Sequence, residues 1–263
     1  MTMINNVFAF DIETVPDVEF GRRLHGLEGL TDKQVGYVMQ TRQREQTGSE
    51  FLSLEQQRIV AISIAMRERG GFKVWSVGDV EATEEELIRR FFDGIERLAP
   101  NLVSWNGAGF DLPVLHYRAL RHRIQAHRYW EMGDEDSSYK WNNYISRFHW
   151  RHIDLMDVLS GFQGRGRVGL DKMAQLLGFP GKLGMSGEHV WDAFLDGRIE
   201  DIRNYCETDV INTYLIYLRF ELMRGRLTHE EHDREVDLVR QTLRDALKPH
   251  LQEYAAEWAK CSG

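Results

Sequence analysis

The chain has 263 residues, of which 42 % are hydrophobic, and it carries a formal net charge of −8. This composition supports a sizeable core in one or two domains, and no apolar stretch approaches the ~20 residues that a membrane span requires. The acidic balance argues against a general nucleic-acid coat protein, which needs a broad basic surface. The start of the chain lacks a signal-peptide pattern, and Cys206 and Cys261 lie far apart without metal-ligand spacing. We therefore expect a soluble cytoplasmic protein with no membrane partner.

The first part of the chain predicts a sheet interrupted by one polar insertion. Short apolar runs predict strands at residues 4–10, 59–65, 72–77 and 102–105. Residues 15–57 are polar and rich in Gln and Arg, and we interpret them as an insertion made mostly of helix and loop. The capping box formed by Thr83 and Glu86 predicts a helix that ends at Pro100.

The remainder of the chain predicts helices and one further strand. Helices are expected at 112–124, 170–177, 188–196 and 199–224, with a fifth strand at 153–155. A second capping box, Thr228 with Glu231, predicts one amphipathic helix that continues to about residue 258. Consecutive strands followed by alternating helices and strands indicate an α/β fold, a mixed sheet flanked by helices. We assign residues 1–225 to one domain and residues 226–263 to a helical extension packed on it.

Two carboxylates follow the first apolar run, in the segment Phe10-Asp11-Ile12-Glu13-Thr14. Side chains two apart on a strand share a face, so Asp11 and Glu13 point the same way. Two adjacent carboxylates repel each other unless a cation or a proton lies between them. The pair therefore indicates one part of a metal site, although a strand ending in solvated acids would show the same pattern.

Two later segments contain further acids in a suitable context. In the segment 106–115, NGAGFDLPVL, Asp111 follows a strand and opens a helix, where it could face a cleft or simply cap the helix. In the segment 205–209, YCETD, Tyr205 and Asp209 are four apart on a long apolar helix and share one of its faces. Taken alone, that pair is also compatible with packing and a surface charge.

The three segments together resemble the DEDD exonucleases of the ribonuclease H-like fold. FDIET, NGAGFDLPVL and YCETD occur here in order, and the chain looks most like the proofreading 3′–5′ exonuclease domain of family B DNA polymerases and its stand-alone predicted relatives. The resemblance runs over most of residues 4–220. Tyr205 lies four residues before Asp209, whereas Asn204 occupies the position five before it, which places the chain in the tyrosine subclass. The resemblance implies removal of nucleotides from the 3′ end of single-stranded or frayed DNA.

The residue types suit this chemistry. Phosphodiester hydrolysis needs a nucleophile made from water and stabilisation of the leaving oxygen, and two hard cations ~3.5–4 Å apart supply both. Four carboxylates suit two Mg²⁺ or Mn²⁺ ions, and no Cys/His cluster suggests zinc. By resemblance, Asp11 would bridge both ions, Glu13 and Asp209 would bind the ion of the nucleophile, and Asp111 would bind the other. Tyr205 would orient the attacking water.

Weaker features have two interpretations each. Asn106, Phe110 and Lys182 are candidate substrate contacts. Asn106 could instead stabilise the conformation of its loop, and Phe110 could be structural. Lys182 follows Gly178 and Pro180, which are explained by the end of a helix alone. Residues 164–169, GRGRVG, match a dinucleotide-binding pattern, but the preceding context is a poor strand, so a flexible loop is favoured.

Residues 125–151 combine many aromatic rings with histidines and arginines. Such a segment can form a stacking platform for unpaired bases. Alternatively, the rings pack this segment onto the core of the protein. For any single ring we favour this packing role over a role in stacking.

Two rival functions remain open. Tyrosine-type relatives resembling ribonuclease D trim RNA, and no short motif distinguishes the two sugars. A non-catalytic nucleic-acid-binding module would not need four crowded carboxylates, which counts against it. A dinucleotide-dependent oxidoreductase is set aside. At 263 residues the chain leaves no room for a polymerase, so any proofreading or other DNA-repair role would act in trans.

Overall fold

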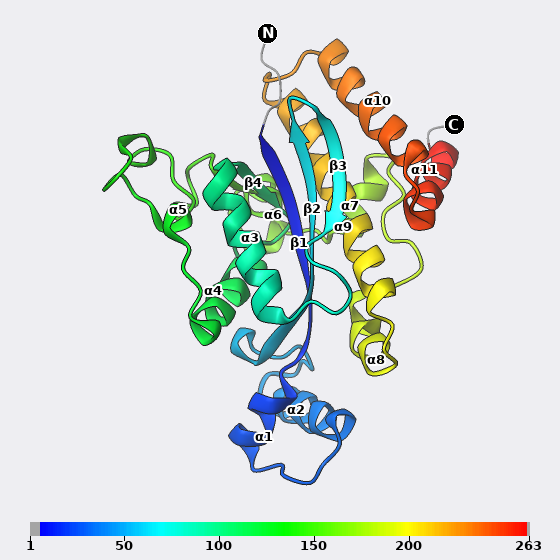
Figure 1. Ribbon diagram of the computed structural model, residues 1–263. Helices are drawn as coiled ribbons and strands as arrows, with labels where there is room; N and C mark the ends of the chain where they lie inside the picture. Colours follow the sequence, from blue (N-terminus) through cyan, green and yellow to red (C-terminus); the bar gives the residue numbers. More distant parts are fainter. Residues whose placement is uncertain (1–5, 262–263) are drawn as a thin grey trace.

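The computed structural model describes residues 6–261, which form a five-stranded sheet with helices on both faces (Figure 1). The strands are β1 (Val7–Pro16), β2 (Gln57–Glu68), β3 (Gly71–Ser76), β4 (Asn101–Ser104) and β5 (His152–Asp154). Their order is β3-β2-β1-β4-β5. β2 runs antiparallel to its neighbours β1 and β3, whereas β4 and β5 run parallel to β1. This mixed sheet confirms the predicted α/β, ribonuclease H-like fold class.

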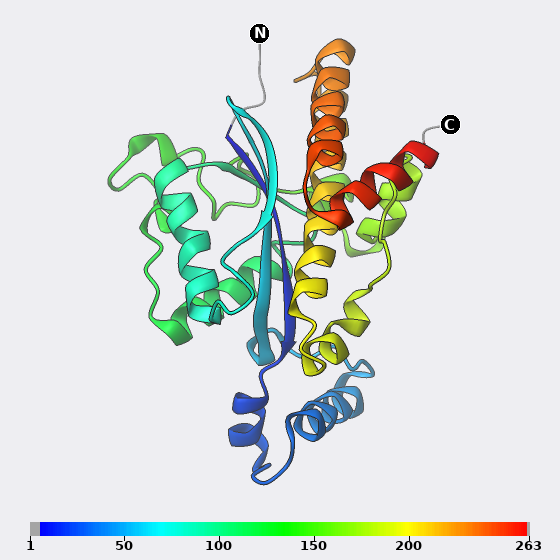
Figure 2. The ribbon, with the colours of Figure 1, turned by 45° about the vertical axis from the view of Figure 1, so that its right-hand side comes forward.

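Two groups of helices cover the faces of the sheet (Figure 2). One face packs against α3 (Glu84–Leu98), α4 (Asp111–His122) and α5 (His127–Trp130). The other face packs against α6 (Leu155–Leu159), α7 (Leu170–Leu176), α9 (Ile199–Met223), α10 (His229–Asp245) and α11 (Pro249–Cys261), while α8 (Val190–Leu195) packs beside α9 near the end of β1. Short 3-10 turns complete the elements: η1 (Leu54–Gln56), η2 (Ser137–Tyr139), η3 (Gly164–Gly166) and η4 (Gly187–His189).

Alternation along β1 decides which side chains reach which layer. Phe8, Phe10 and Ile12 are buried with α3 and α4, whereas Val7 and Ala9 are buried with α9. Because side chains two apart share a face, Asp11 and Glu13 continue the row of Val7 and Ala9 toward α9. The strand therefore delivers both acids to the layer that contains the long helix.

The first strand differs from its predicted bounds of 4–10. Residues 4 and 5 lie outside the described residues, and the strand runs on to Pro16, where it pairs with Gln57 of β2. The register shifts between Glu13 and Thr14, which is a β-bulge. Pairing with β2 extends the strand through residues whose local pattern is not that of an apolar run.

The connection between β1 and β2 forms two helices, α1 (Val18–His25) and α2 (Asp32–Thr47). A capping box of Thr31 and Gln34 starts α2, and Gly48, with a left-handed φ of 81°, ends it. Val35, Met39 and Leu52 form a small buried cluster of their own. Figure 1 shows α1 and α2 beyond the end of β1, with α4 and α8 nearby on either side.

The prediction of a single helix from Thr228 to about residue 258 is wrong. The structure has α10 ending at Asp245 and α11 beginning at Pro249. Proline is tolerated in the first turn of a helix, but it disfavours a helical conformation of the residue before it, here Lys248. Within residues 6–261, no helix is both long and apolar enough to cross a membrane.

Candidate active site

Four carboxylates from three elements line one cavity of about 850 Å³. Asp11 and Glu13 come from β1, Asp111 opens α4, and Asp209 lies on α9. The first turn of α4 is held against β1 because Asp111 Oδ1 accepts a hydrogen bond of 3.2 Å from the Ile12 amide. The structure thus brings together all four acids that the sequence suggested as metal ligands.

Burial raises the pKa of each of these acids, and repulsion from neighbouring carboxylates adds to the effect. Burial is the largest cause for all four, and it raises the pKa of Asp111 to about 7 and that of Asp209 to about 6. The pKa of Asp11 lies well above its usual value because the other three carboxylates add to the effect of burial. Glu13 behaves in the same way, with Asp209 as the carboxylate that raises its pKa most. A cluster of this kind requires protons or cations to balance its charge.

The donor set fits hard divalent cations. Asp209 is 5 % exposed, and its Oδ1 atom is buried without a hydrogen-bond partner among the described residues. Ligand atoms of Asp11, Glu13 and Cys206 lie within 4.8 Å of one another. Burial raises the pKa of the Cys206 thiol, with Asp11 and Glu13 adding to the effect, so the sulfur remains a neutral S–H group. The carboxylate oxygen atoms are therefore the donors available to a cation, and oxygen is the donor that Mg²⁺ and Mn²⁺ prefer.

Lys182 reaches into this site from the loop before η4. Its Nζ donates a hydrogen bond of 2.6 Å to the Tyr205 hydroxyl and lies 3.9 Å from Asp209 Oδ2. The sequence suggested Lys182 only as a contact for the substrate backbone, and its position against Tyr205 was not foreseen. The pKa of Tyr205 is raised by burial and by the neighbouring carboxylates, led by Asp209, so the hydroxyl is neutral.

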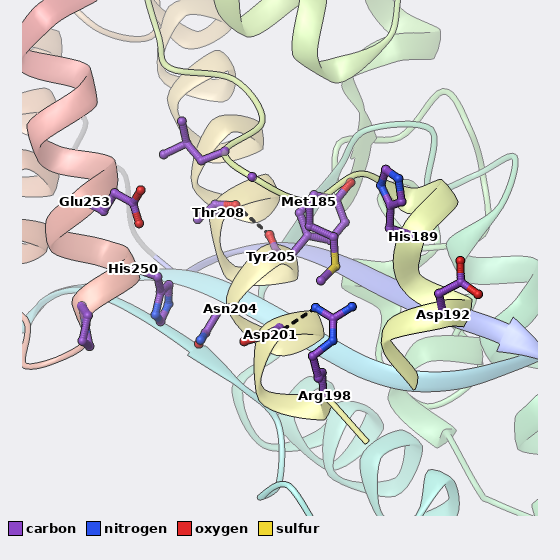
Figure 3. Close-up of a pocket in the computed structure, with 13 residues that line it drawn as sticks. Met185, His189, Asp192, Arg198, Asp201, Asn204, Tyr205, Thr208, His250 and Glu253 are labelled. Carbon is purple, nitrogen blue, oxygen red and sulfur yellow. Dashed lines mark hydrogen bonds and ion pairs between the residues drawn. The ribbon is translucent and has the colours of Figure 1, made fainter. Parts of the chain in front are cut away.

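Tyr205 is not among the residues that line the four-carboxylate cavity; it borders a second cavity of about 750 Å³, drawn in Figure 3. This cavity lies between residues 183–192, the start of α9 and the start of α11. In Figure 3, Tyr205 and Thr208 lie on the α9 side of the cavity, and His250 and Glu253 lie on the α11 side. Because Lys182 lines the four-carboxylate cavity, the hydrogen bond between Tyr205 and Lys182 lies between the two cavities.

The loop between β4 and α4 carries the other two candidate contacts, Asn106 and Phe110, and both line the four-carboxylate cavity. Asp154, at the end of β5, accepts hydrogen bonds from the amides of Asn106 (3.0 Å) and Ala108 (2.9 Å). These bonds hold the loop, in which Asn106 has a left-handed φ of 68°. Asp154 is thus a positioning residue that acts through the backbone.

One wall of the cavity was missed entirely from the sequence. Residues 49–54 of the connection between β1 and β2 contribute to it, and the ring of Phe51 lies 5.4 Å from the ring of Phe110, centroid to centroid. Trp191 of α8 also lines the cavity. The available signal was the apolar group Phe51, Leu52 and Leu54 at the end of a segment that is polar overall.

The aromatic segment 125–151 divides into buried and exposed rings. Tyr129, Tyr139 and Tyr144 are buried against the α3 face, and the Tyr144 hydroxyl donates a hydrogen bond of 2.6 Å to the Pro100 carbonyl. Trp141 and Phe148 are largely exposed. No ring of this segment lines the four-carboxylate cavity. Residues 164–169 begin with the surface turn η3, between α6 and α7, with no strand before it.

Comparison with known proteins adds a family and a distant relative. A family described as a predicted 3′–5′ exonuclease related to the exonuclease domain of PolB matches residues 49–258, a span that contains Asp111, Tyr205 and Asp209 but not Asp11 or Glu13. A catalytic subunit of DNA polymerase epsilon from Arabidopsis thaliana is 27 % identical over 228 residues, which is 81 % of this chain. The match spans only 10 % of the length of that polymerase.

Proposed function

The chain belongs to the family of predicted 3′–5′ exonucleases related to the exonuclease domain of PolB, and from this premise we propose that it hydrolyses single-stranded or frayed DNA from the 3′ end with divalent cations. The observation that carries the proposal is the meeting of four buried carboxylates from β1, α4 and α9 in one cavity. The buried Oδ1 atom of Asp209, which has no hydrogen-bond partner among the described residues, supports a cation bound jointly by the four carboxylates.

In this proposal, Asp11, Glu13, Asp111 and Asp209 hold two Mg²⁺ or Mn²⁺ ions. The bound ions neutralise phosphate charge, lower the pKa of water and stabilise the leaving oxygen. Such ions also explain how a chain of net charge −8 can accept a polyanion in an acidic cavity.

Tyr205 and Lys182 act as a pair in this proposal. An ammonium group has no acceptor, so the Tyr205 oxygen must accept the hydrogen bond from Lys182. The Tyr205 hydroxyl then directs its own proton toward the carboxylates, where Asp209 shares a side-chain hydrogen bond with it. The pair therefore supports a positioning role for Tyr205 toward the attacking water.

Incubation of 5′-labelled single-stranded DNA and RNA with Mg²⁺ or Mn²⁺ tests the proposal. We expect a ladder of products shortened from the 3′ end of the DNA, which disappears when the cations are chelated. A ladder from RNA alone would reassign the substrate to RNA. Binding of both oligonucleotides without cleavage would instead indicate a non-catalytic binding module.

A further inference from the structure

The connection between β1 and β2 reaches both sides of the four-carboxylate cavity. On the α4 side, Asp17 forms an ion pair of 2.5 Å with Arg118, and both side chains are buried. On the α8 side, α2 lies against Trp191 so closely that a Cβ atom at Gly36 would lie 2.9 Å from the indole ring. Figures 1 and 2 show α1 and α2 beyond the end of β1. The segment is therefore a wall of the cavity, anchored at both sides.

Within this wall, Phe51 is exposed although its neighbour is anchored. Leu52 is buried in the cluster with Val35 and Met39, and its carbonyl accepts a hydrogen bond of 3.0 Å from Gln57. Phe51, in contrast, is 61 % exposed and faces the cavity, with the ring of Phe110 tilted against it at 55°. An exposed aromatic residue alone is common, but this ring is held in place at a cavity that contains four acids.

The distribution of charge along the cavity separates two kinds of ligand group. Lys182 is the one lysine or arginine among the residues that line the cavity, and it lies beside Asp209. The wall from the connection contributes Gln40, Glu50 and Phe51 but no cation. Phosphate would therefore be attracted to the side of Lys182 and of the four carboxylates once they hold cations, whereas a neutral, flat group suits the side of Phe51.

We propose that Phe51 is a specificity-determining residue that stacks on the base at the 3′ end of the substrate and so holds the terminal nucleotide unpaired. The inference rests on the proposed exonuclease function and adds a substrate contact to it. Stacking on an aromatic ring tolerates every base because each has a π-face. The contact thus selects an unpaired end and no particular sequence.

The test compares two 5′-labelled single-stranded DNA oligonucleotides that differ only at the 3′-terminal nucleotide, which either carries its base or is abasic. Cleavage of the terminal nucleotide is followed for the wild type, Phe51→Ala and the control Tyr37→Ala. Tyr37 is 69 % exposed on α2 and does not line the cavity. Melting temperatures verify that each variant is folded.

We expect Phe51→Ala to raise KM for the base-bearing oligonucleotide on the order of 10-fold, with little change in kcat. For the abasic oligonucleotide, KM of Phe51→Ala should equal that of the wild type. Phe51→Trp should restore the wild-type KM for the base-bearing oligonucleotide. Tyr37→Ala should leave KM unchanged for both oligonucleotides. An equal loss on both oligonucleotides, or no loss on either, overturns the role of Phe51 while leaving the exonuclease intact. Absence of cleavage by the wild type would contradict the proposed function itself.

Discussion

Asp209 is the proposed metal ligand whose burial carries the clearest consequence for stability. Its carboxylate is buried beside three others, and its pKa is raised to about 6 by burial. Without bound cations, the charged forms of these acids repel one another, so removing one of them relieves repulsion.

We therefore predict that Asp209→Asn abolishes exonuclease activity, while the melting temperature of the cation-free protein stays the same or rises. Asp11→Ala should behave alike. Activity assays and thermal unfolding in chelator measure the two effects, with Asp196→Asn, an exposed site at the end of α8, as the matched control. Cleavage at the wild-type rate by Asp11→Ala would disprove the proposed metal site.

The same cluster predicts a pH dependence of stability. The pKa values of Asp111 and Asp209 are raised to about 7 and about 6 in the folded protein, above those of the unfolded chain. Their stabilising contribution is present when both are protonated and is lost as the pH rises through these values. In chelator, the stability of Asp209→Asn relative to wild type should therefore increase from pH 5 to pH 8, as measured by urea unfolding at each pH. A relative stability that falls over this range would show that the pKa of Asp209 is not raised in the folded protein.

Tyr205 is expected to assist without holding a cation. Replacement by Phe removes the hydroxyl that accepts the bond from Lys182 but leaves the four carboxylates in place. We predict a loss in kcat on the order of 10²-fold, within the range of positioned acid–base groups. Titration with Mn²⁺ should give an affinity close to that of the wild type. Much weaker Mn²⁺ binding by Tyr205→Phe would mean that the tyrosine contributes to the metal site directly.

Among the elements, α11 is joined to α9 by both polar and apolar contacts. Glu207 of α9 accepts hydrogen bonds from Lys248 (2.6 Å) and His250 (2.8 Å) at the start of α11. Burial acts to raise the pKa of Glu207, but hydrogen bonds from His250, Lys248 and Ser76 and the charge of Lys248 lower it to about 2. Farther along α11, Trp258 is 2 % exposed and packs edge-on against Phe179. The helix is thus part of the core on the α9 face of the sheet.

We predict that Trp258→Ala lowers the free energy of unfolding by about 3–5 kcal/mol, because a large buried ring leaves a cavity. Urea unfolding of the variant measures this, and Lys260→Ala, an exposed change on the same helix, should stay close to wild type. A loss as small as that of the control would show that α11 is not needed for the stability of the core.

For the whole molecule, we expect the acidic cavity and its anchored wall to favour a 3′ end that is already unpaired. Opening a terminal base pair costs a few kcal/mol, which a blunt duplex must supply before cleavage. We predict that a 3′ overhang is cut fastest, a mismatched terminus more slowly and a blunt duplex most slowly. With a net charge of −8, the salt dependence of binding should be shallow. Equal rates on the three substrates would show that the enzyme does not depend on an unpaired end.

Much of the site could be predicted because its signals are local. Alternation on a strand places Asp11 and Glu13 on one face whatever surrounds them, and a spacing of four places Tyr205 and Asp209 on one face of a helix. The apolar runs of β2 to β5 likewise reveal strands without knowledge of their partners. The order of the three acidic motifs then indicates the family.

Other features depend on contacts between distant residues, and only the tertiary structure decided them. The extension of β1 to Pro16 requires pairing with β2, and the bond between Lys182 and Tyr205 joins residues 23 apart in the chain. The approach of Phe51 to Phe110 follows from the docking of α1 and α2 beyond the end of β1. Periodicity reports which face of an element is apolar, but the partner of that face is selected by burial and shape over the whole molecule. For this reason the sequence by itself determined the acids, the tyrosine and the family, while the tertiary structure decided what surrounds them.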